Sequence, residues 1–484
     1  MSQETAAARV AGRRRPAPDT ALVGLVGLTF ALVASLGIVL ALTGAPVEGD
    51  QERGRALTVG STGSPEVVRH LLTERSAALL EGDAQRWTET VDPGAGEFTA
   101  RQRGLLRILT ALPRASWTYT YAGQGPALPP ERAGRLGQDA FIARVRLSYR
   151  LAAFDARAVQ RDQFLTFARR EGRWLIVGDD DAGAPGRAAP PDPWDLGEVK
   201  LAHGRSSLVL ARPGAAGPSA VDIATLADRA VEQVRELWPE PWPQHVVVVV
   251  PANMSEMVRL LHGGTGTEGG DTPSTGEWTG GVVNRAAELA KIAAVTTGQP
   301  TGTPGGTTTG NRIVLNPMAF AGLTEAGRQV VLAHESTHVA SRNLAAMAVP
   351  SWLSEGFADY VAYRNTGLDV DDVAGEALAQ LRTGAVPPQL PTAADFDASR
   401  GPVSASYARA WLAVRLIAMT RGEADLLEFY RILAAAPPGD TAVASALAFR
   451  EALGTSEEEF VRAWRDSMVQ LARSPPAAER EPVP

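Results

Sequence analysis

Two histidines and a glutamate stand at a spacing that suits a metal site. The stretch VVLAHESTHVASR, which begins at Val330, contains His334, Glu335 and His338. On an α-helix, residues four positions apart lie one above the other, so the two imidazoles could share one tetrahedral ion. Glu335 would lie about 100° further round, where its carboxylate could take a proton from a metal-bound water. The chain has only six histidines, so chance produces this pattern on the order of once in a few hundred such chains.

The residues around this motif favour a half-buried helix. Thr324 is a suitable N-cap for the stretch EAGRQVVLAHESTHVASR, because its hydroxyl can accept a hydrogen bond from a backbone N–H of the first turn. Apolar side chains at 330–332 and at Val339 form a stripe beside the histidines. The alternative is a pair of histidines hydrogen-bonded within a core. A third ligand would decide between the two.

Two carboxylates that follow the motif are candidates for this third ligand. The stretch PSWLSEGFADYVAYR carries Glu355 and, one helical turn later, Asp359. Pro350 and Ser351 mark the start of a second helix, on which both carboxylates would share a face. The segment between the two helices is long enough to turn the chain back, so either carboxylate could meet the histidines.

The combination of HESTH with WLSEGFADY resembles the gluzincin metallopeptidases, and the nearest groups in pattern are aminopeptidase N and thermolysin. This resemblance implies a zinc metallopeptidase in which one Zn²⁺ is held by His334, His338 and Glu355. It implies further that Glu335 is the general base and that Asp359 orients a ligand histidine, His334. An aspartate-liganded zincin, with Asp359 in place of Glu355, stays open. A metzincin is excluded, because the SRNLAA segment after the motif contains neither glycine nor histidine.

The sequence departs from these relatives in two respects. The segment between His338 and Glu355 is slightly shorter than is usual in either group, and no GAMEN-like motif lies upstream of HESTH. That motif anchors the free amino terminus of an exopeptidase substrate. Endopeptidase and exopeptidase action therefore both stay open.

A tyrosine is the candidate for stabilising the oxyanion that forms during peptide hydrolysis. Thermolysin-like enzymes use a downstream histidine, but no histidine follows His338. Tyr407, which opens the stretch SYARAWLAVRLIAM, stands in a context that resembles the catalytic tyrosine of the aminopeptidase N group. The alternative is a tyrosine that packs at a helix start. Tyr360 and Tyr363 lie on the ligand helix itself, and Tyr430 lies in an amphipathic stretch that favours a core position.

Composition narrows the classes of function. A chain of 484 residues is long enough for two or three domains. Its formal net charge of −7 argues against a general nucleic-acid-binding protein. It contains no cysteine, which excludes disulfides, thiol nucleophiles and cysteine-ligated zinc. Histidine and carboxylate are left as the metal ligands.

Residues 21–43 form an uncharged apolar run, ALVGLVGLTFALVASLGIVLALT, long enough to cross a bilayer. Arginines at 13–15 precede it and acidic residues within 48–52 follow. The positive-inside rule therefore predicts a single-pass cell-membrane helix, with residues 1–20 in the cytoplasm and the rest outside. A cleaved signal peptide is the alternative. The apolar run before His334 is too short for an intramembrane site, so the site would work in water.

Residues 63–182 predict helices followed by antiparallel strands. The stretch FIARVRLSYRL alternates apolar and polar residues, and QFLTFARREGRWLIVGDDD predicts a hairpin that turns at Glu171 and Gly172. This order resembles the SnoaL-like (nuclear-transport-factor-like) cone fold, whose pocket could bind a small ligand or dock a partner. A spacer without catalysis is the alternative. Residues 44–62 before this domain and 183–195 after it are expected to be linkers.

Residues 196–474 are expected to be the peptidase domain, and 475–484 a disordered tail. HVVVVVP predicts a buried strand, and AKIAAVTTG and NRIVLNP predict two more around a turn. In gluzincins, an edge strand before the HExxH helix holds the substrate backbone, and IAAVTT is either that edge or a plain core strand. The expected fold class is α+β: one N-terminal transmembrane helix, a SnoaL-like cone domain, and a mainly helical gluzincin domain with a small mixed or antiparallel sheet.

The function predicted from the sequence is a membrane-anchored, extracytoplasmic zinc metallopeptidase. Its partners would be a peptide or protein substrate and, through residues 21–43, the membrane, with no nucleic acid. The sequence does not define the oligomeric state or the substrate. The rival is a non-catalytic scaffold or sensor with a structural zinc site, although His334, Glu335, His338 and Glu355 are all present.

Overall fold

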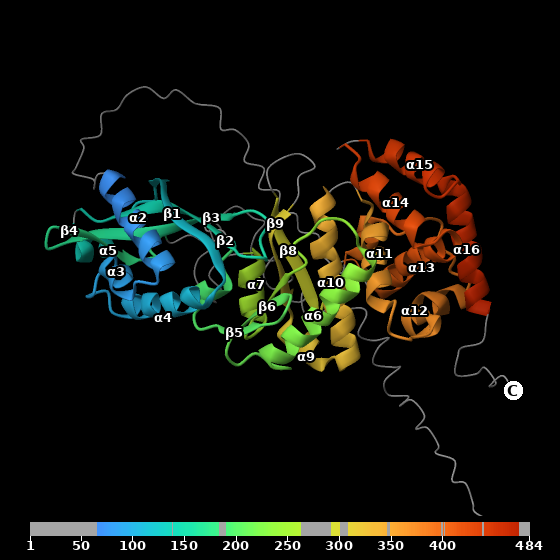
Figure 1. The fold of residues 1–484 in the computed structure, drawn as a ribbon, viewed down its shortest axis with the longest axis horizontal. Coiled ribbons are helices and arrows are strands. Elements are labelled where there is room, and N and C mark those ends of the chain that lie inside the picture. The colour runs from blue at the N-terminus through green and yellow to red at the C-terminus, as the bar shows by residue number, and fades with distance from the viewer. Residues whose placement is uncertain are drawn as a thin grey trace, which may run out of the picture.

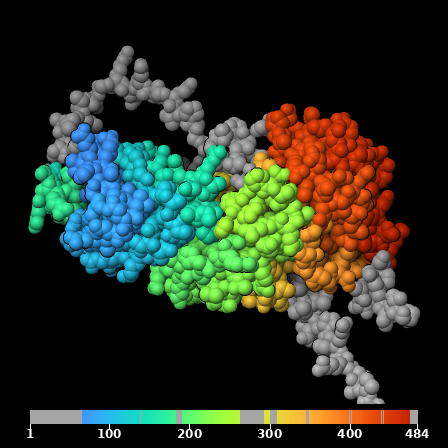
Figure 2. Space-filling view, in the orientation of Figure 1, coloured from blue at the N-terminus to red at the C-terminus, as the bar shows by residue number. Residues whose placement is uncertain are grey.

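The computed structural model describes residues 65–473, except for 138, 183–189, 263–291, 301–307, 346–348, 398–399, 401 and 438–439. Three parts follow one another along the long axis of the molecule (Figure 1): a first sheet with its helices, a second sheet between helices, and a group of C-terminal helices. The space-filling view shows the three parts in contact along this axis (Figure 2).

The first domain begins with helices and continues with an antiparallel sheet, in which β1 and the helix α5 after it were not predicted. The four strands pair in chain order, each antiparallel to the next. Glu171 and Gly172 both have positive φ, at 49° and 85°, and form the predicted tight turn between the last two strands. The elements are α2 (Pro65–Glu81), α3 (Ala84–Glu89), α4 (Glu97–Ala111), β1 (Arg114–Gln124), α5 (Pro130–Leu136), β2 (Phe141–Leu151), β3 (Val159–Arg170) and β4 (Arg173–Gly178).

The second sheet has five strands in the order β5-β6-β7-β9-β8. Its three inner strands β6, β7 and β9 run parallel, and the outer strands β5 and β8 are antiparallel to their neighbours. The sheet is therefore mixed, one of the two forms expected, and β8 lies at its edge. The strands are β5 (Lys200–His203), β6 (Ser207–Ala211), β7 (Val246–Val250), β8 (Ala294–Pro300) and β9 (Thr308–Leu315).

Helices cover both faces of the second sheet. Along β7, Val246, Val248 and Val250 pack with α6 (Ala220–Leu237) and α10 (Glu325–Ala345) on one face. Val247 and Val249 pack on the other face with α7 (Met254–His262). A strand buried on both faces needs apolar side chains at every position, which explains the run of five valines.

Helices dominate the chain after the second sheet, as predicted. Helix α10 begins where expected: the Thr324 hydroxyl accepts a hydrogen bond from the Gly327 backbone N–H at 3.1 Å. The remaining elements are η2 (Pro193–Leu196) before the second sheet, α9 (Pro317–Gly322), α11 (Ser351–Tyr363), α12 (Val370–Arg382), η3 (Ala393–Phe396), α13 (Ser404–Arg421), α14 (Glu423–Ala434), α15 (Thr441–Glu451) and α16 (Glu457–Arg473).

A tryptophan joins the first domain to the second sheet. Trp194, in the 3₁₀ helix η2, is 3% exposed, and its ring lies 5.7 Å from that of Trp117 and 5.4 Å from that of Tyr149. One continuous cluster of buried apolar residues includes these three rings and also Val247 and Val249 of β7. The two sheets therefore share a hydrophobic core.

The fold class predicted from the sequence is wrong in one part. The described residues form an α+β protein with two sheets, and no helix among them is long and apolar enough to cross a membrane. Helix α10, with 21 residues, is long enough for a span, but it contains Glu325, Arg328, Glu335 and Arg342, and charged side chains are costly inside a bilayer. Residues 21–43, on which the membrane helix was predicted, lie outside the described residues, as do 1–20, 44–62 and 475–484.

Candidate metal site

Helix α10 places the two histidines of the motif side by side in the interior. His334 and His338 are 1% and 2% exposed, and their Nε2 atoms lie 3.0 Å apart. The apolar stripe predicted beside them is buried against the second sheet and its neighbours. This burial fixes the rotation of α10, and the histidines on the adjacent face therefore point toward α11 rather than toward solvent.

Helix α11 brings a carboxylate to the two histidines. The helix begins at Ser351, directly after Pro350, as the sequence predicts. Glu355 is 6% exposed, and its Oε2 atom lies 3.3 Å from His334 Nε2 and 3.4 Å from His338 Nε2. The three ligand atoms therefore form a compact triangle between two helices. Among the described residues, this is the one group of histidine and carboxylate atoms close enough to hold a metal ion.

The triangle fits a zinc ion. Zinc binds nitrogen and oxygen ligands at about 2.0–2.2 Å, and tetrahedral geometry then places neighbouring ligand atoms about 3.3–3.6 Å apart. The observed separations of 3.0, 3.3 and 3.4 Å lie at or just below this range. Glu355 Oε2 is buried and lies within 3.4 Å of both imidazole nitrogens, an arrangement that suits an atom able to bind a metal. Two imidazoles and one carboxylate are a typical zinc ligand set.

Asp359 holds the first histidine in the orientation that metal binding requires. It lies one turn after Glu355 on α11, and its Oδ1 atom is 2.8 Å from His334 Nδ1. An ionised carboxylate can only accept a hydrogen bond, so Nδ1 carries the proton and Nε2 points into the triangle. Glu355 rather than Asp359 is the carboxylate whose oxygen lies close to both imidazole Nε2 atoms, and the orienting role expected of Asp359 stays a prediction.

In the absence of metal, the histidines and carboxylates of the site shift one another's pKa values. Burial alone would lower the pKa of His334, but Asp359 and Glu355 outweigh it and raise this pKa to about 10. Burial would likewise raise the pKa of Glu355, yet the charges and hydrogen bonds of His338 and His334 lower it to about 2. The site therefore holds a proton on an imidazole in the absence of metal, and a cation is favoured in the triangle.

Glu335 is fully buried beside the ligand triangle, and its two carboxylate oxygens differ in their hydrogen bonding. Oε2 accepts a hydrogen bond of 2.5 Å from the Thr296 hydroxyl on β8. Oε1 receives no hydrogen bond from any described residue. One oxygen is thus held in place while the other can accept a proton, as a general base requires.

Tyr407, the candidate oxyanion donor, lies beside His334. It is 2% exposed on α13, and its ring centroid is 6.3 Å from that of His334. The other tyrosines are engaged elsewhere. Tyr360 and Tyr363 both lie on α11: the Tyr360 hydroxyl donates to Glu423 at 2.9 Å, and the Tyr363 ring packs against Trp411. Tyr430 is buried between Trp238 and Phe357, in the core position predicted for it.

Three residues near the site escaped the sequence analysis. Thr296 contacts Glu335 across a large sequence separation, which no local pattern reveals. Arg342 stands one helical turn after His338, a spacing visible in the sequence, and its Nη1 donates to the Thr296 carbonyl at 2.6 Å. Gly356 allows α11 to approach α13 closely, because a Cβ at this position would lie 2.4 Å from the Ala410 carbonyl oxygen. A glycine directly after a ligand residue on a helix was the available signal for this crossing.

The fold and site together define an α+β protein with a buried HExxH-plus-glutamate site for one metal ion, next to the edge of a mixed sheet. No protein-family model matches the chain, and no curated protein matches it. Among solved structures, an M1 zinc metallopeptidase from Deinococcus radiodurans is 16% identical, with 71% of this chain and 64% of that chain covered and a TM-score of 0.30.

Two further structures are similar to the same degree. An M1 zinc metallopeptidase mutant from Deinococcus radiodurans bound to a Tyr-Ser-Ala substrate is 14% identical, with 76% of this chain and 64% of that chain covered and a TM-score of 0.32. A two-domain M1 zinc metallopeptidase mutant bound to L-arginine is 15% identical, with 72% and 62% covered and a TM-score of 0.30. The matches span less than two thirds of those chains. Similarity at this level is no basis for assigning an activity, which has to be inferred from the site.

Proposed function

We propose that this protein is a zinc-dependent metallopeptidase that hydrolyses peptide bonds. The observation that carries the proposal is the buried triangle of His334, His338 and Glu355, with the Glu335 carboxylate held next to it and one of its oxygens without a hydrogen-bond donor. Zinc bound in the triangle would supply a Lewis acid that polarises a carbonyl group and makes water more acidic.

Residues of the chain carry out the proton transfer, the stabilisation of the oxyanion and the binding of the substrate. Glu335 accepts a proton from the attacking water through Oε1 and passes it to the leaving amine. Tyr407 donates a hydrogen bond to the oxyanion of the substrate, a role supported by its position beside His334. Strand β8 pairs with the backbone of an extended peptide, a role supported by its position at the sheet edge and its contact with α10 through Thr296.

We propose a SnoaL-like fold for the first domain because three helices precede its antiparallel sheet, with α5 between β1 and β2. We infer a spacing or recognition role for it, without catalytic groups of its own. An extracytoplasmic location for the peptidase stays a prediction, because residues 21–43 lie outside the described residues. The substrate class is a peptide or protein.

Substitution of Glu335 by glutamine tests the proposed function in the full chain. We expect the wild type to bind one zinc ion per chain and to cleave a peptide library. The variant should retain zinc, which is measured by elemental analysis, and lose about 10²–10⁴ in turnover because the general base is gone. Tyr407→Phe should lose about 10²–10³ in turnover with zinc retained, because one oxyanion donor is removed.

The matched control is Glu325→Gln, at the exposed start of the same helix, where the carboxylate only pairs with Arg229. This control should cleave like the wild type. A wild-type protein that binds zinc stoichiometrically and cleaves no peptide would contradict the proposal and indicate a structural zinc site. A Glu335→Gln variant with full turnover would show that Glu335 is not the general base. Full turnover in Tyr407→Phe would remove only the role of that residue.

A further inference from the structure

Thr296 is held by helix α10 through two of its polar groups. Its hydroxyl lies 2.5 Å from Glu335 Oε2 and 3.2 Å from the Glu335 backbone oxygen, and its carbonyl accepts a hydrogen bond of 2.6 Å from Arg342 Nη1. A hydroxyl carries one proton, and the shorter contact with the carboxylate receives it. Thr296 is 2% exposed and Glu335 is fully buried, so water does not compete for this bond.

This hydrogen bond distinguishes the two oxygens of the proposed general base. A carboxylate without such a bond could rotate and exchange Oε1 for Oε2, whereas donation from Thr296 fixes one rotational state. The oxygen that receives no donor from the described residues is then the one left to accept a proton. A base that is fixed before the reaction needs no reorganisation during it.

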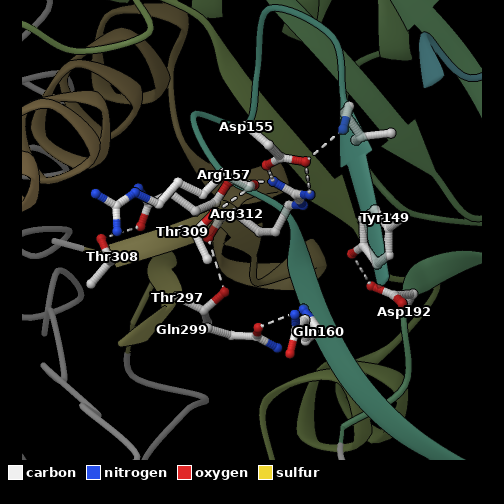
Figure 3. A network of polar contacts seen from close by, with 12 residues as sticks. Tyr149, Asp155, Arg157, Gln160, Asp192, Thr297, Gln299, Thr308, Thr309 and Arg312 are labelled. Carbon is white, nitrogen blue, oxygen red and sulfur yellow. Dashed lines mark hydrogen bonds and ion pairs between the residues drawn. The ribbon is translucent and has the colours of Figure 1, made fainter. Parts of the chain in front are cut away.

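The hairpin that carries Thr296 is held on its other side by the first domain (Figure 3). Arg312 on β9 forms a two-pronged ion pair with Asp155, in the loop between β2 and β3, at 2.8 and 3.1 Å. The two side chains are 9% and 0% exposed. In the pairing of β8 with β9, Arg312 lies opposite Thr297, which is the residue directly after Thr296. The first domain is therefore connected to the Glu335 carboxylate through Asp155, Arg312 and the β8 segment that carries Thr296.

Further contacts join the same two segments. The Thr309 hydroxyl donates to the Arg157 carbonyl at 2.9 Å, and the Gln160 backbone N–H donates to the Gln299 side chain at 3.2 Å (Figure 3). Gly310 has a φ of +65° and packs so closely that a Cβ there would lie 2.7 Å from a methyl group of Val159. Both strands of the hairpin are thus tied to β3 or to the loop before it.

We propose that Thr296 is a positioning residue for the general base Glu335, and that the first domain contributes to catalysis by holding the β8–β9 hairpin that carries it. This inference rests on the proposed peptidase function. It gives the first domain a role in the reaction through its contacts with the hairpin rather than with the proposed metal ligands.

Two substitutions of Thr296 test the first half of the inference. Thr296→Val removes the hydroxyl and keeps the branched shape, whereas Thr296→Ser keeps the hydroxyl. We expect Thr296→Val to lose about 10- to 100-fold in kcat, the range typical of a hydrogen-bonding partner of a functional group, with KM and zinc content near the wild type. Thr296→Ser should recover most of kcat. A Thr296→Val variant with the wild-type kcat, or a serine variant as slow as valine, would overturn the inference.

A double substitution tests the second half. Asp155→Asn with Arg312→Gln replaces the ion pair with two neutral amides and leaves no unpaired buried charge. We expect faster amide hydrogen exchange at residues 294–300 and a lower kcat, with zinc retained. Unchanged kcat and unchanged exchange in this variant would show that the first domain does not support the base.

The two levels of inference can fail separately. If the wild type cleaves peptides and Glu335→Gln does not, the Thr296 variants test positioning alone. If the wild type cleaves nothing, the proposed function fails, and crystal structures of zinc-loaded Thr296→Val and Thr296→Ser still test the contact. Rotation of the Glu335 carboxylate only in the valine variant supports positioning, and an unmoved carboxylate in both overturns it.

Discussion

Asp359 orients the proposed metal ligand His334 through a hydrogen bond. The hydrogen bond at Nδ1 turns Nε2 toward Glu355, and the nearby carboxylates raise the pKa of His334 to about 10 in the metal-free protein. Zinc binds only the neutral imidazole at Nε2. Metal and proton therefore compete for the same nitrogen over the whole physiological range of pH.

This competition predicts that zinc binding releases about one proton between pH 7 and pH 9. His334 is protonated below its pKa of about 10, so the apparent zinc affinity should rise about tenfold per pH unit and level off near that pKa. Calorimetric titration in two buffers of different ionisation enthalpy measures the released protons. Asp359→Asn should release fewer protons and weaken binding about 10- to 100-fold. Equal heats in both buffers for the wild type would contradict the prediction.

Local spacing accounts for the part of the site that the sequence predicts. His334, Glu335 and His338 lie on one helix, and Glu355 with Asp359 on another, so a period of about 3.6 residues places each group correctly. Thr296 meets Glu335 only because β8 pairs with β9 and lies against α10. Such contacts depend on strand order and register, which an apolar run does not encode. For the same reason the sequence left open whether β8 was an edge or a core strand.

The crossing of α11 and α13 is the element contact that brings Glu355 and Tyr407 to one place. At Gly356 the two helices approach so closely that a Cβ would lie 2.4 Å from the Ala410 carbonyl oxygen and 2.9 Å from a methyl group of Val414. A backbone carbonyl in a buried helix cannot move aside cheaply, so a larger residue would separate the helices.

Gly356→Ala should therefore lower both stability and metal binding. We expect a loss of about 1–3 kcal/mol in the free energy of unfolding from overpacking, and a lower zinc affinity because Glu355 is the next residue. Gly375→Ala in the middle of α12 is the matched control. A Cβ there meets nothing within 4 Å, so alanine should stabilise that helix by about 0.5–1 kcal/mol. Thermal unfolding and zinc titration measure both effects, and a stabilised Gly356→Ala variant would refute the packing argument.

At the scale of the whole molecule, the two sheets share a core. The buried apolar cluster that includes Trp117 and Tyr149 extends through Trp194 to Val247 and Val249 on the second sheet. The buried ion pair described above adds a polar contact at the same junction. Composition and local patterns predicted separate domains, whereas the shared core depends on long-range packing that they do not report.

The shared core predicts a single cooperative unfolding transition for the two sheets. Calorimetry should give one peak with equal calorimetric and van't Hoff enthalpies. Trp194→Ala should lower the midpoint of that peak by several degrees without splitting it, because removal of a buried tryptophan costs about 3–5 kcal/mol. Met419→Ala, at a side chain that is 66% exposed, should leave the midpoint unchanged. Two separate peaks in the wild type would show that the sheets unfold independently.

The shared core also constrains how the chain can be made. The ribosome releases the amino-terminal sheet through Ile176 before it has synthesised the apolar strands up to Val314 that complete the cluster. At about 5–20 residues per second, the interval is on the order of ten seconds. During that time part of the nascent apolar surface has no partner from its own chain. A chaperone that binds apolar surface at the tunnel exit would therefore increase the yield of folded protein.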